Sequence, residues 1–450
     1  MASRFLDAVA AAAESALPAL PGSGLAWLEA ARRRQLDALL RDGLPGARSE
    51  AWKYTPLRAL DQRRYATGDA AAADRPVDAS LFQLPEVDGP RLVFVNGVFR
   101  ADLSALGSLP DGLELQPLAH ALQGAAAEPL RFFLGRDWAD RSDAFVRLNA
   151  AFASDGMVLR VAAGSVAERP VHLVHVGAPA DTALAWHSRN VIELGQGASL
   201  RLVEHHLASG AHTHLGTLVS DVVLRAGARL DALVLQDAAE GAVLVRRHAL
   251  RLDADASARV HALELGGALV RHELDVELRG DGARLETRGA FLPRGRQHMD
   301  TRLDIRHAAR NTRSDALWRG VADQRGRGVF HGQIVVAPGA DGTDAALSNK
   351  NLLLSPHAEI DSQPVLEIYA DEVKAAHGAT VGQLDERSLF YLRSRGLPFE
   401  QARNLLTVAF CRAALDSVPE PALREHLNRL LAAHLPLQIA AGTEQSGAPA

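Results

Sequence analysis

Between residues 157 and 380, apolar and polar residues alternate in short runs. Val158-Leu159-Arg160-Val161 and Val171-His172-Leu173-Val174 are two such runs, and Val, Leu and Ile are interleaved with Arg, Glu and His. This two-residue period is that of β-strands with one buried face. The runs follow one another with no long helical pattern between them, so the region predicts a succession of short strands.

The same region contains an internal repeat. Gly197-Ala198-Ser199-Leu200 recurs at residues 227–230, 257–260 and 282–285, with spacings of 30, 30 and 25 residues, and a looser copy lies at 357–360. Such periods are typical of solenoids, in which each repeat buries its apolar face only against its neighbours. A small residue at a fixed place suits a tight corner. The spacing favours a β-solenoid, and an antiparallel sandwich with Gly-rich hairpins is the alternative left open.

Helical patterns precede the strand region. Leucines within residues 25–40 fit one face of a helix, and helical composition returns over residues 117–153. Between these segments, the strand-like Arg91–Val95 runs into Asn96-Gly97, which is a hairpin turn signal. The N-terminal part is therefore predicted to be helical with some strand.

Three more helices are predicted after Gly382, over residues 385–395, 399–418 and 421–435. The first is stopped by Gly396, since glycine commonly follows the last helical turn. The fold class predicted from these patterns is mainly β, with a solenoid core between helical N- and C-terminal parts.

The patterns divide the chain into four parts. We expect an N-terminal helical and mixed domain at residues 1–155 and a β-helix core at 156–382. A C-terminal helical domain at 383–437 and a disordered tail at 438–450 complete the chain.

Composition narrows the class of protein. Of 450 residues, 47% are hydrophobic and 23% charged, which is an ordinary globular balance, and the net charge of −5 gives no electrostatic reason to expect nucleic-acid binding. No apolar run approaches the ~18 residues needed to cross a bilayer. The single cysteine, Cys411, excludes a disulfide scaffold, a zinc site built on several thiolates and a self-contained four-cysteine iron–sulfur cluster. It lies on the apolar side of a predicted helix, so we expect it to be buried.

The N-terminus does not have the pattern of a signal peptide. Asp7 and Glu14 flank the alanine stretch Ala10–Ala13, and no basic cluster precedes it. We expect an amphipathic helix there and a cytoplasmic protein.

Histidines are the candidate metal ligands. Glu204-His205-His206, His212 and His214 lie close together in sequence, and imidazoles at such spacing could hold a metal ion. Strand alternation, however, places His205 and His206 on opposite faces, so a solvated strand end is the other interpretation. No phosphate-binding loop with Gly-Lys-Ser or Gly-Lys-Thr and no nucleophile-elbow serine occurs in the chain.

His377 has a different setting. Small residues surround it in Ala375-Ala376-His377-Gly378-Ala379, so its ring is predicted to be uncrowded at the end of the strand region. A histidine there could ligate a metal or shuttle a proton. A structural role is the alternative that composition alone leaves open.

Several long segments resemble one known family. They are Ser49–Thr55, Phe330–Ile334, Asn349–Ser355, Pro364–Asp371, Val373–Gly382 and Phe390–Gly396. Together they resemble the SufB/SufD family of iron–sulfur cluster assembly proteins, and within it the SufD branch. The resemblance is strong over residues 300–415 and looser upstream.

The resemblance implies a right-handed parallel β-helix with helical ends. It also implies a scaffold subunit that is not itself an enzyme, in a complex of one SufB, two copies of the ATPase SufC and one SufD. In such complexes the C-terminal helices, here roughly residues 385–435, dock on SufC, and the β-helix pairs with that of SufB. The complex builds a nascent iron–sulfur cluster, and the resemblance leaves open whether it also binds reduced flavin.

One site residue follows from the resemblance. The family's histidine in the His-Gly-Ala-Thr-Val-Gly motif corresponds to His377, which is thought to face a SufB cysteine and help to hold the nascent cluster. Family members often have Cys-Ser before this histidine, whereas this chain has Ala375-Ala376. His377 is thus the one soft-metal candidate in the motif, and a neutral imidazole can ligate iron beside a partner's thiolates.

Two other functions remain as alternatives. A β-helix enzyme acting on a polymer would show clustered carboxylates on one face, and no candidate pair is evident. A stand-alone metal carrier would use the segment from Glu204 to His214.

Overall fold

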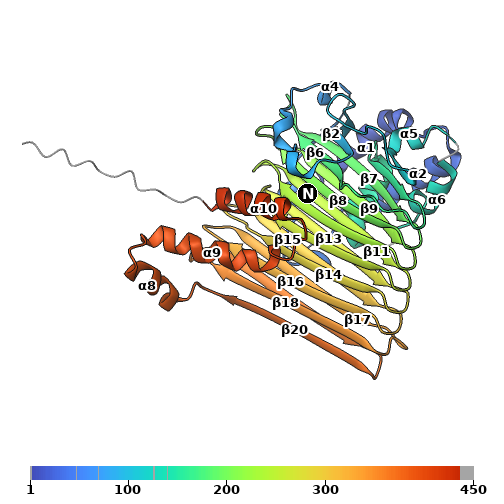
Figure 1. Cartoon of the computed structure of the whole chain (residues 1–450). Helices are drawn as coiled ribbons and strands as arrows, with labels where there is room; N and C mark the ends of the chain where they lie inside the picture. The colour runs from blue at the N-terminus through green and yellow to red at the C-terminus, as the bar shows by residue number, and fades with distance from the viewer. Residues whose placement is uncertain (1–2, 47, 69, 125–126, 139, 436–450) are drawn as a thin grey trace, which may run out of the picture.

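The computed structural model describes most of the chain. The described residues are 3–46, 48–68, 70–124, 127–138 and 140–435. Within them, parallel strands form a long stack, with N-terminal helices at one end and C-terminal helices along one side (Figure 1). The tail predicted at residues 438–450 lies outside the described residues.

The core is a parallel β-solenoid of about eight turns, in which each turn gives one strand to each of two sheets. The odd sheet contains β5 (Met157–Val161), β7 (Leu184–Leu194), β9 (Leu215–Leu224), β11 (Val243–Leu252), β13 (Leu269–Leu278), β15 (His298–His307), β17 (Arg327–Val336) and β19 (Glu359–Ile368). The even sheet contains β6 (Val171–Gly177), β8 (Ser199–Ala208), β10 (Arg229–Asp237), β12 (Ser257–Glu264), β14 (Arg284–Phe291), β16 (Arg313–Ala322), β18 (Thr343–Leu353) and β20 (Val373–Gly382). The predicted fold class is confirmed, and the antiparallel sandwich is wrong.

The strand register changes the position of one copy of the predicted sequence repeat and assigns another copy to the other sheet. Arg229 pairs with Ser257, so the third copy begins at Asp255 and not at Ser257. Asp255 adopts a φ of 55°, a left-handed conformation that Asp tolerates better than most residues, and it therefore replaces the corner glycine. The looser copy at 357–360 leads into β19, which belongs to the other sheet.

One corner of the solenoid is built from residues with positive φ, stacked coil on coil. Each backbone N–H donates to the carbonyl before the next corner residue, as Gly197 does to Ala226 at 2.9 Å. This hydrogen-bond ladder accounts for the repeat that the sequence displays. The corner residues are Gly164, Gly197, Gly227, Asp255, Gly282, Asn311 and Gly342.

Side chains between the two sheets form the main hydrophobic core, which runs from Leu92 to Ile360. Trp318 is its largest fully buried side chain. Its indole occupies the space left by Gly289, where a Cβ atom would lie 2.4 Å from the ring. Packing of this kind makes the interior sensitive to the loss of volume.

The N-terminal elements cover one end of the stack and the outer face of the odd sheet. Three short strands extend the two sheets beyond the first coil: β2 (Arg91–Val95), β3 (Val98–Phe99) and β4 (Leu113–Pro117). β4 is antiparallel to β5, and β2 and β3 form the hairpin predicted at Asn96-Gly97, both residues having positive φ.

The predicted N-terminal helix that includes Leu28 is also confirmed as α2. The remaining elements are α1 (Arg4–Ala16), η1 (Leu17–Ala19), α2 (Ala26–Asp42), η2 (Glu50–Trp52), α3 (Arg58–Asp61), β1 (Ala66–Thr67), α4 (Ala70–Ala73), η3 (Ala79–Leu81), η4 (Pro85–Val87), α5 (Leu118–Ala121), α6 (Ala127–Leu134), η5 (Arg141–Asp143) and α7 (Ala144–Phe152).

The three predicted C-terminal helices are confirmed as α8 (Glu386–Ser394), α9 (Phe399–Leu415) and α10 (Pro421–His434). α9 and α10 pack on the outer face of the even sheet, in one hydrophobic cluster that includes Leu263 and Cys411. Cys411 is fully buried, as predicted, and burial raises the pKa of its thiol to about 12. Among the described residues, no helix is both long and apolar enough to span a membrane.

Replacing Trp318 with alanine should destabilise the solenoid by about 3–5 kcal/mol, because the vacated space cannot be refilled by the two packed sheets. Urea unfolding followed by circular dichroism measures the loss. Phe132→Ala is the control, since Phe132 is 71% exposed and its truncation should change stability by no more than about 0.5 kcal/mol. Equal losses for the two variants would contradict this description of the core.

Candidate functional site at the open end of the solenoid

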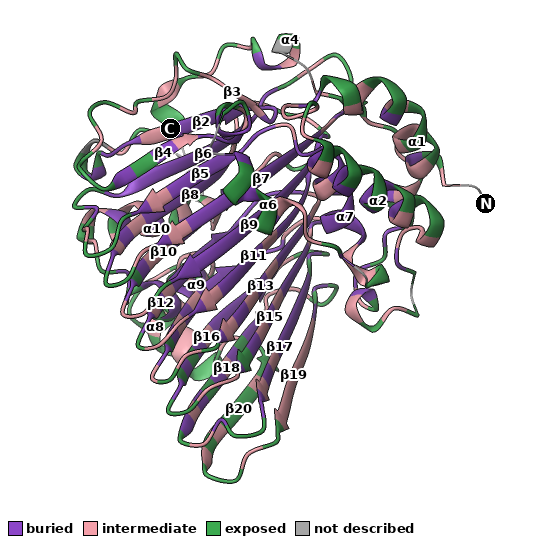
Figure 2. Cartoon of the chain, turned by 90° about the vertical axis from the view of Figure 1, so that its right-hand side faces the viewer, coloured by how far each residue is buried: buried purple, intermediate pink, exposed green. Residues whose placement is uncertain are grey.

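Within the described residues, no further coil covers the C-terminal end of the solenoid. β19 pairs with β17 and β20 pairs with β18, and no other strand of the described residues pairs with either of them. Figure 2 shows that β20 is largely exposed and β19 only partly buried, in contrast to the strands before them. Each strand has ten residues and leaves one backbone edge without a partner strand. Such edges are templates for pairing with another chain.

His377 lies in the middle of β20 on the face that continues the interior of the solenoid. It stands opposite Leu347 of β18, whose side chain is buried in the main core. His377 is nevertheless exposed, because no further coil covers it. No hydrogen bond joins its ring to the rest of the described chain. His377 is therefore uncrowded, as predicted, and neither of its ring nitrogens is engaged in a hydrogen bond with the described residues.

Polar side chains just inside this end hold the last strands in place. Ser362 of β19 donates a hydrogen bond to Asn349 Oδ1 across the interior, at 2.8 Å. Asn351 donates to the same oxygen at 2.5 Å and to the carbonyl of Thr380 in β20 at 3.1 Å. These contacts link both sheets next to His377, so the final strand has a fixed position although one of its edges is free.

The cluster from Glu204 to His214 is not the solvated strand end considered from the sequence. Glu204, His205 and His206 are all buried. His205 and His206 lie on opposite faces of β8, as predicted: His206 contacts Glu204 inside the solenoid at 2.5 Å, and His205 contacts His172 outside it at 3.2 Å. Among the described residues, no three His, Cys, Asp or Glu side chains are arranged to hold a metal ion.

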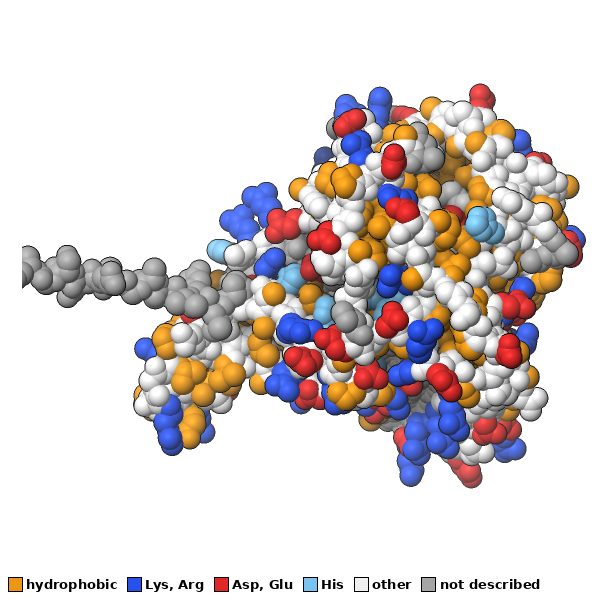
Figure 3. Space-filling model, turned by 45° about the horizontal axis from the view of Figure 1, so that its top comes forward, with side chains coloured by type: hydrophobic (Ala, Val, Ile, Leu, Met, Phe, Trp, Pro, Cys, Tyr) orange, Lys and Arg blue, Asp and Glu red, His pale blue; other side chains and the backbone are white. Residues whose placement is uncertain are grey.

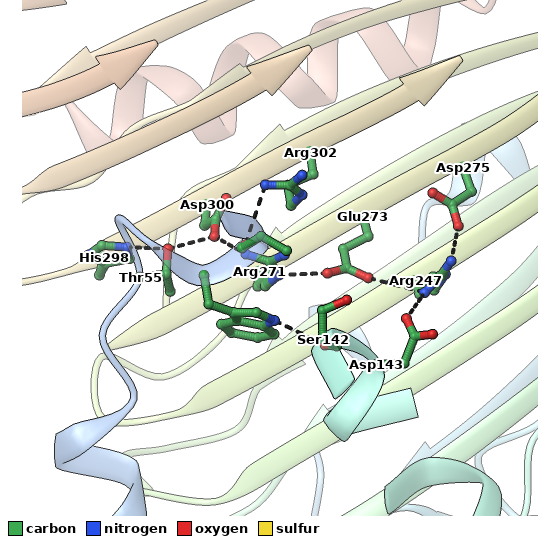
Figure 4. A network of polar contacts seen from close by, with 12 residues as sticks. Thr55, Ser142, Asp143, Arg247, Arg271, Glu273, Asp275, His298, Asp300 and Arg302 are labelled. Atoms are coloured by element: carbon green, nitrogen blue, oxygen red, sulfur yellow. Dashed lines mark hydrogen bonds and ion pairs between the residues drawn. The ribbon is translucent and has the colours of Figure 1, made fainter. Parts of the chain in front are cut away.

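The segment Ser49–Thr55 serves as an anchor. The Trp52 ring packs 3.8 Å from the Arg271 guanidinium, and its indole N–H donates to the Ser142 carbonyl at 3.0 Å. Thr55 donates to Asp300 at 2.6 Å (Figure 4). The contacts fasten the N-terminal segment to β13 and β15 of the odd sheet. Local sequence patterns carry no signal for the contacts of Trp52 with Arg271 and of Thr55 with Asp300, because each pair is more than 200 residues apart in the chain.

Apolar side chains are exposed on the C-terminal helices. Phe390 and Tyr391 of α8 are 74% and 56% exposed, and Leu405 of α9 is 50% exposed. Arg395 lies over the Tyr391 ring. Figure 3 shows hydrophobic and basic side chains together on the lobe that projects from the body, where α8 lies in Figure 1. Large exposed aromatic side chains next to arginine are typical of protein interfaces.

Comparison with known protein families identifies the chain. A family model described as the SufBD core domain of the SUF system for FeS cluster assembly matches residues 176–410. A second model, the SufBD protein N-terminal region, matches residues 19–173. The chain belongs to the SufBD family. The resemblance seen in the sequence is confirmed, and the family's role connects this solenoid with iron–sulfur cluster assembly.

Individual SufBD relatives match most of the chain. The iron–sulfur cluster assembly protein SufD of Escherichia coli (strain K12) is 29% identical over 90% of this chain and 92% of its own length. A SufBD family protein of Synechocystis is 29% identical over 86% of each chain. A SufBD family protein of Mycobacterium leprae is 34% identical over 48% of this chain and 58% of its own length. The chain is thus a SufD homologue along most of its length.

The buried histidine His175 makes the folding stability of the chain depend on pH. The His175 ring stacks on the rings of Phe94, Trp186 and His206, and neither ring nitrogen has a partner among the described residues. Burial lowers its pKa to about 3, whereas in an unfolded chain it titrates near pH 6.5. Between these values only the unfolded state binds the proton. The histidine therefore makes stability fall as the pH falls, by about 1.4 kcal/mol per pH unit.

His175→Phe should remove this contribution while keeping the stacked ring. Near pH 7.5 the variant should differ from the parent by less than about 1.5 kcal/mol, and its relative stability should rise as the pH falls from 6 to 4. Urea unfolding at several pH values measures the difference, with His357→Phe, at an exposed position, as the control. Parallel pH profiles for the parent and His175→Phe would contradict the prediction.

Proposed function

We propose that this SufBD family protein is a scaffold subunit of a complex with a SufB-type protein and a SufC-type ATPase. In this proposal it contributes His377 to the site where a nascent iron–sulfur cluster forms. The observation that carries the proposal is the open end of the solenoid, where His377 is exposed on the last strand. The chain itself would carry out no chemical step, and ATP hydrolysis would belong to the SufC-type partner.

The free strand edges support docking of a SufB-type partner. β19 and β20 each offer unpaired backbone N–H and C=O groups that another β-solenoid can continue. Docking there would cover the exposed end of the core and bring a partner's side chains over His377. A histidine at this place would then lie within the interface between the two subunits.

A neutral imidazole suits the proposed task. It is a good ligand for iron, and it can share a cluster with thiolates from a partner. Ala375 and Ala376 provide no thiolate of their own, and the one cysteine of the chain, Cys411 of α9, is buried against the even sheet. The cluster is therefore cargo that this chain can hold only together with a partner. Reduced flavin in the complex and a cytoplasmic location remain predictions.

The exposed surface of α8 supports contact with the SufC-type ATPase. Phe390 and Tyr391 project from a helix that follows β20 directly, so this surface lies next to the open end. If ATP binding changes the conformation of the SufC-type partner, the movement would reach α8. Because α8 follows β20 directly, it could then be transmitted to the strand that carries His377.

His377→Ala should leave the chain folded and the complex assembled, because the side chain is exposed and forms no hydrogen bond or ion pair with the described residues. It should reduce the cluster content of the purified complex at least several-fold, measured from iron, acid-labile sulfide and visible absorbance. His357→Ala, which alters another exposed histidine, should leave the content unchanged. An unchanged cluster content in the His377 variant would show that this residue is not a ligand.

The double variant Phe390→Ala/Tyr391→Ala should weaken binding of the SufC-type ATPase. Loss of two interface aromatics at about 2 kcal/mol each corresponds to roughly a thousandfold in Kd. Pull-down and calorimetry with purified partners measure the effect, and Phe132→Ala on the N-terminal part is the matched control. Truncation after Gly382 should abolish binding altogether. Unimpaired binding by the truncated chain would place the docking site elsewhere.

A further inference from the structure

A continuous chain of polar side chains crosses the interior of the solenoid. Glu204 Oε2 lies 3.0 Å from His248 Nε2. His248 Nδ1 lies 3.2 Å from His272 Nε2, and His272 Nδ1 lies 2.8 Å from Glu264 Oε1. The four residues come from β8, β11, β13 and β12, and all are buried. The main core of Leu, Val and Ala side chains surrounds them.

Counting the hydrogens in these contacts shows that the chain needs one more proton than its parts ordinarily carry. Three contacts join the four side chains, and each needs one hydrogen. An ionised carboxylate has none, and a neutral imidazole has one N–H. Two neutral imidazoles between two carboxylates therefore supply only two hydrogens, and the His248–His272 contact would bring two lone pairs together. An additional proton, on the imidazoles or on a carboxyl group, completes the chain.

The charges around these four side chains also favour one additional proton. Arg246 of β11 pairs with Glu264 at 2.7 Å, so the two carboxylates and this guanidinium together have a net charge of −1. One additional proton makes the group neutral, which is the favourable state in a low-dielectric interior. The other titratable groups that face the chain are His206 of β8, which donates to Glu204 at 2.5 Å, and His175 of β6, which stacks on His206.

The two flanking carboxylates are suited to receive hydrogen bonds. Contacts with His206 and His248 hold the pKa of Glu204 well below its usual range, against the effect of burial. Contacts with His272 and Arg246 similarly lower the pKa of Glu264. Burial and the Arg246 charge lower the pKa of His272 to about 4, although its contact with Glu264 acts in the opposite direction. A cation confined to the His272 ring is therefore unfavourable, and the contacts with its neighbours provide the places over which an additional proton can be shared.

We propose that the solenoid interior contains a proton-binding site, in which one exchangeable proton is shared along Glu204, His248, His272 and Glu264. The contacts form a relay, because moving each hydrogen across its own short contact shifts the charge from one end to the other. The proposal concerns the folded chain by itself and does not depend on the proposed function.

A route for exchange with solvent lies at the Glu204 end. A cavity of about 20 Å³ is lined by four histidines, namely His175, His206, His212 and His214. Among the described residues, His206 Nδ1, His212 Nε2 and both ring nitrogens of His175 have no hydrogen-bond partner. A cavity of this size has room for one water molecule, to which the unpartnered histidine nitrogens could bond. Such a water would connect His206, and through it Glu204, with the half-buried His212.

The variant Glu264→Gln should remove the shared proton while leaving the chain folded. In the parent, Oε1 of Glu264 contacts both Arg246 and His272, whereas its other oxygen has no partner among the described residues. The carboxamide therefore has to turn, so that its N–H₂ donates to His272 Nδ1 and its oxygen accepts from Arg246, and two neutral imidazoles then complete all three contacts. Glu204 and Arg246 still balance each other's charge, and the variant is expected to fold. The matched control is Glu286→Gln, on the solvent side of β14, where the carboxylate is not part of the chain.

Nitrogen-15 NMR of histidine-labelled full-length protein near pH 8 reports the protonation state of each imidazole ring. In the parent we expect one imidazolium, or two rings with averaged shifts, and a low-field proton from the His248–His272 contact. The imidazolium signal, or the pair of averaged shifts, should be absent in Glu264→Gln, where two neutral imidazoles complete the contacts, and present in Glu286→Gln. Only neutral imidazoles in the folded parent, with no low-field proton, would overturn the proposal.

The pH dependence of unfolding provides the second readout. Near pH 8 the unfolded chain has neutral histidines and ionised carboxylates, so the folded parent holds one more proton. Its unfolding equilibrium constant should therefore rise about tenfold per pH unit relative to Glu264→Gln between pH 7 and 8.5. Identical pH profiles for the parent and Glu264→Gln would also overturn the proposal.

Discussion

A parallel solenoid is stable only where each coil is covered by a neighbour, and this requirement determines the rest of the structure. At the N-terminal end, β2, β3 and β4 extend both sheets and the helices close over them. At the C-terminal end the described chain provides no such cover for β19 and β20. Backbone groups and core side chains at that end remain available, so a partner is the natural completion of the stack.

The same requirement for a covering coil explains why His377 is exposed. His377 occupies a position that would be interior in any earlier coil, and it is exposed because the coils stop there. Asn349, Asn351 and Ser362 fix the last strands from inside, so the histidine is presented on a firm edge. Deeper in the stack, interior positions hold a hydrogen-bonded polar chain that the apolar core encloses. Interior-facing polar side chains thus differ in exposure according to their position along the solenoid. His377 on the last strand is exposed, whereas the polar chain from Glu204 to Glu264 is buried.

Much of the fold could be predicted from the sequence, because local patterns determine it. The repeat predicted stacked coils, and Asn96-Gly97 predicted the hairpin. The third copy was misplaced because Asp255 adopts the left-handed corner in place of glycine. The contacts of Trp52 with Arg271 and of Glu204 with His248 gave no signal, since they join residues distant in the chain. The role proposed for His377 rests on family resemblance, and the structure adds its place at the uncovered end.

The central claim is that the uncovered end and the neighbouring helices are completed by other subunits. The most direct test is to co-express this chain with a SufB-type and a SufC-type partner and to determine the mass of the purified species. We predict one complex containing one copy of this chain, one SufB-type subunit and two SufC-type subunits. Elution of this chain as a monomer or homodimer, with the partners elsewhere, would contradict the account.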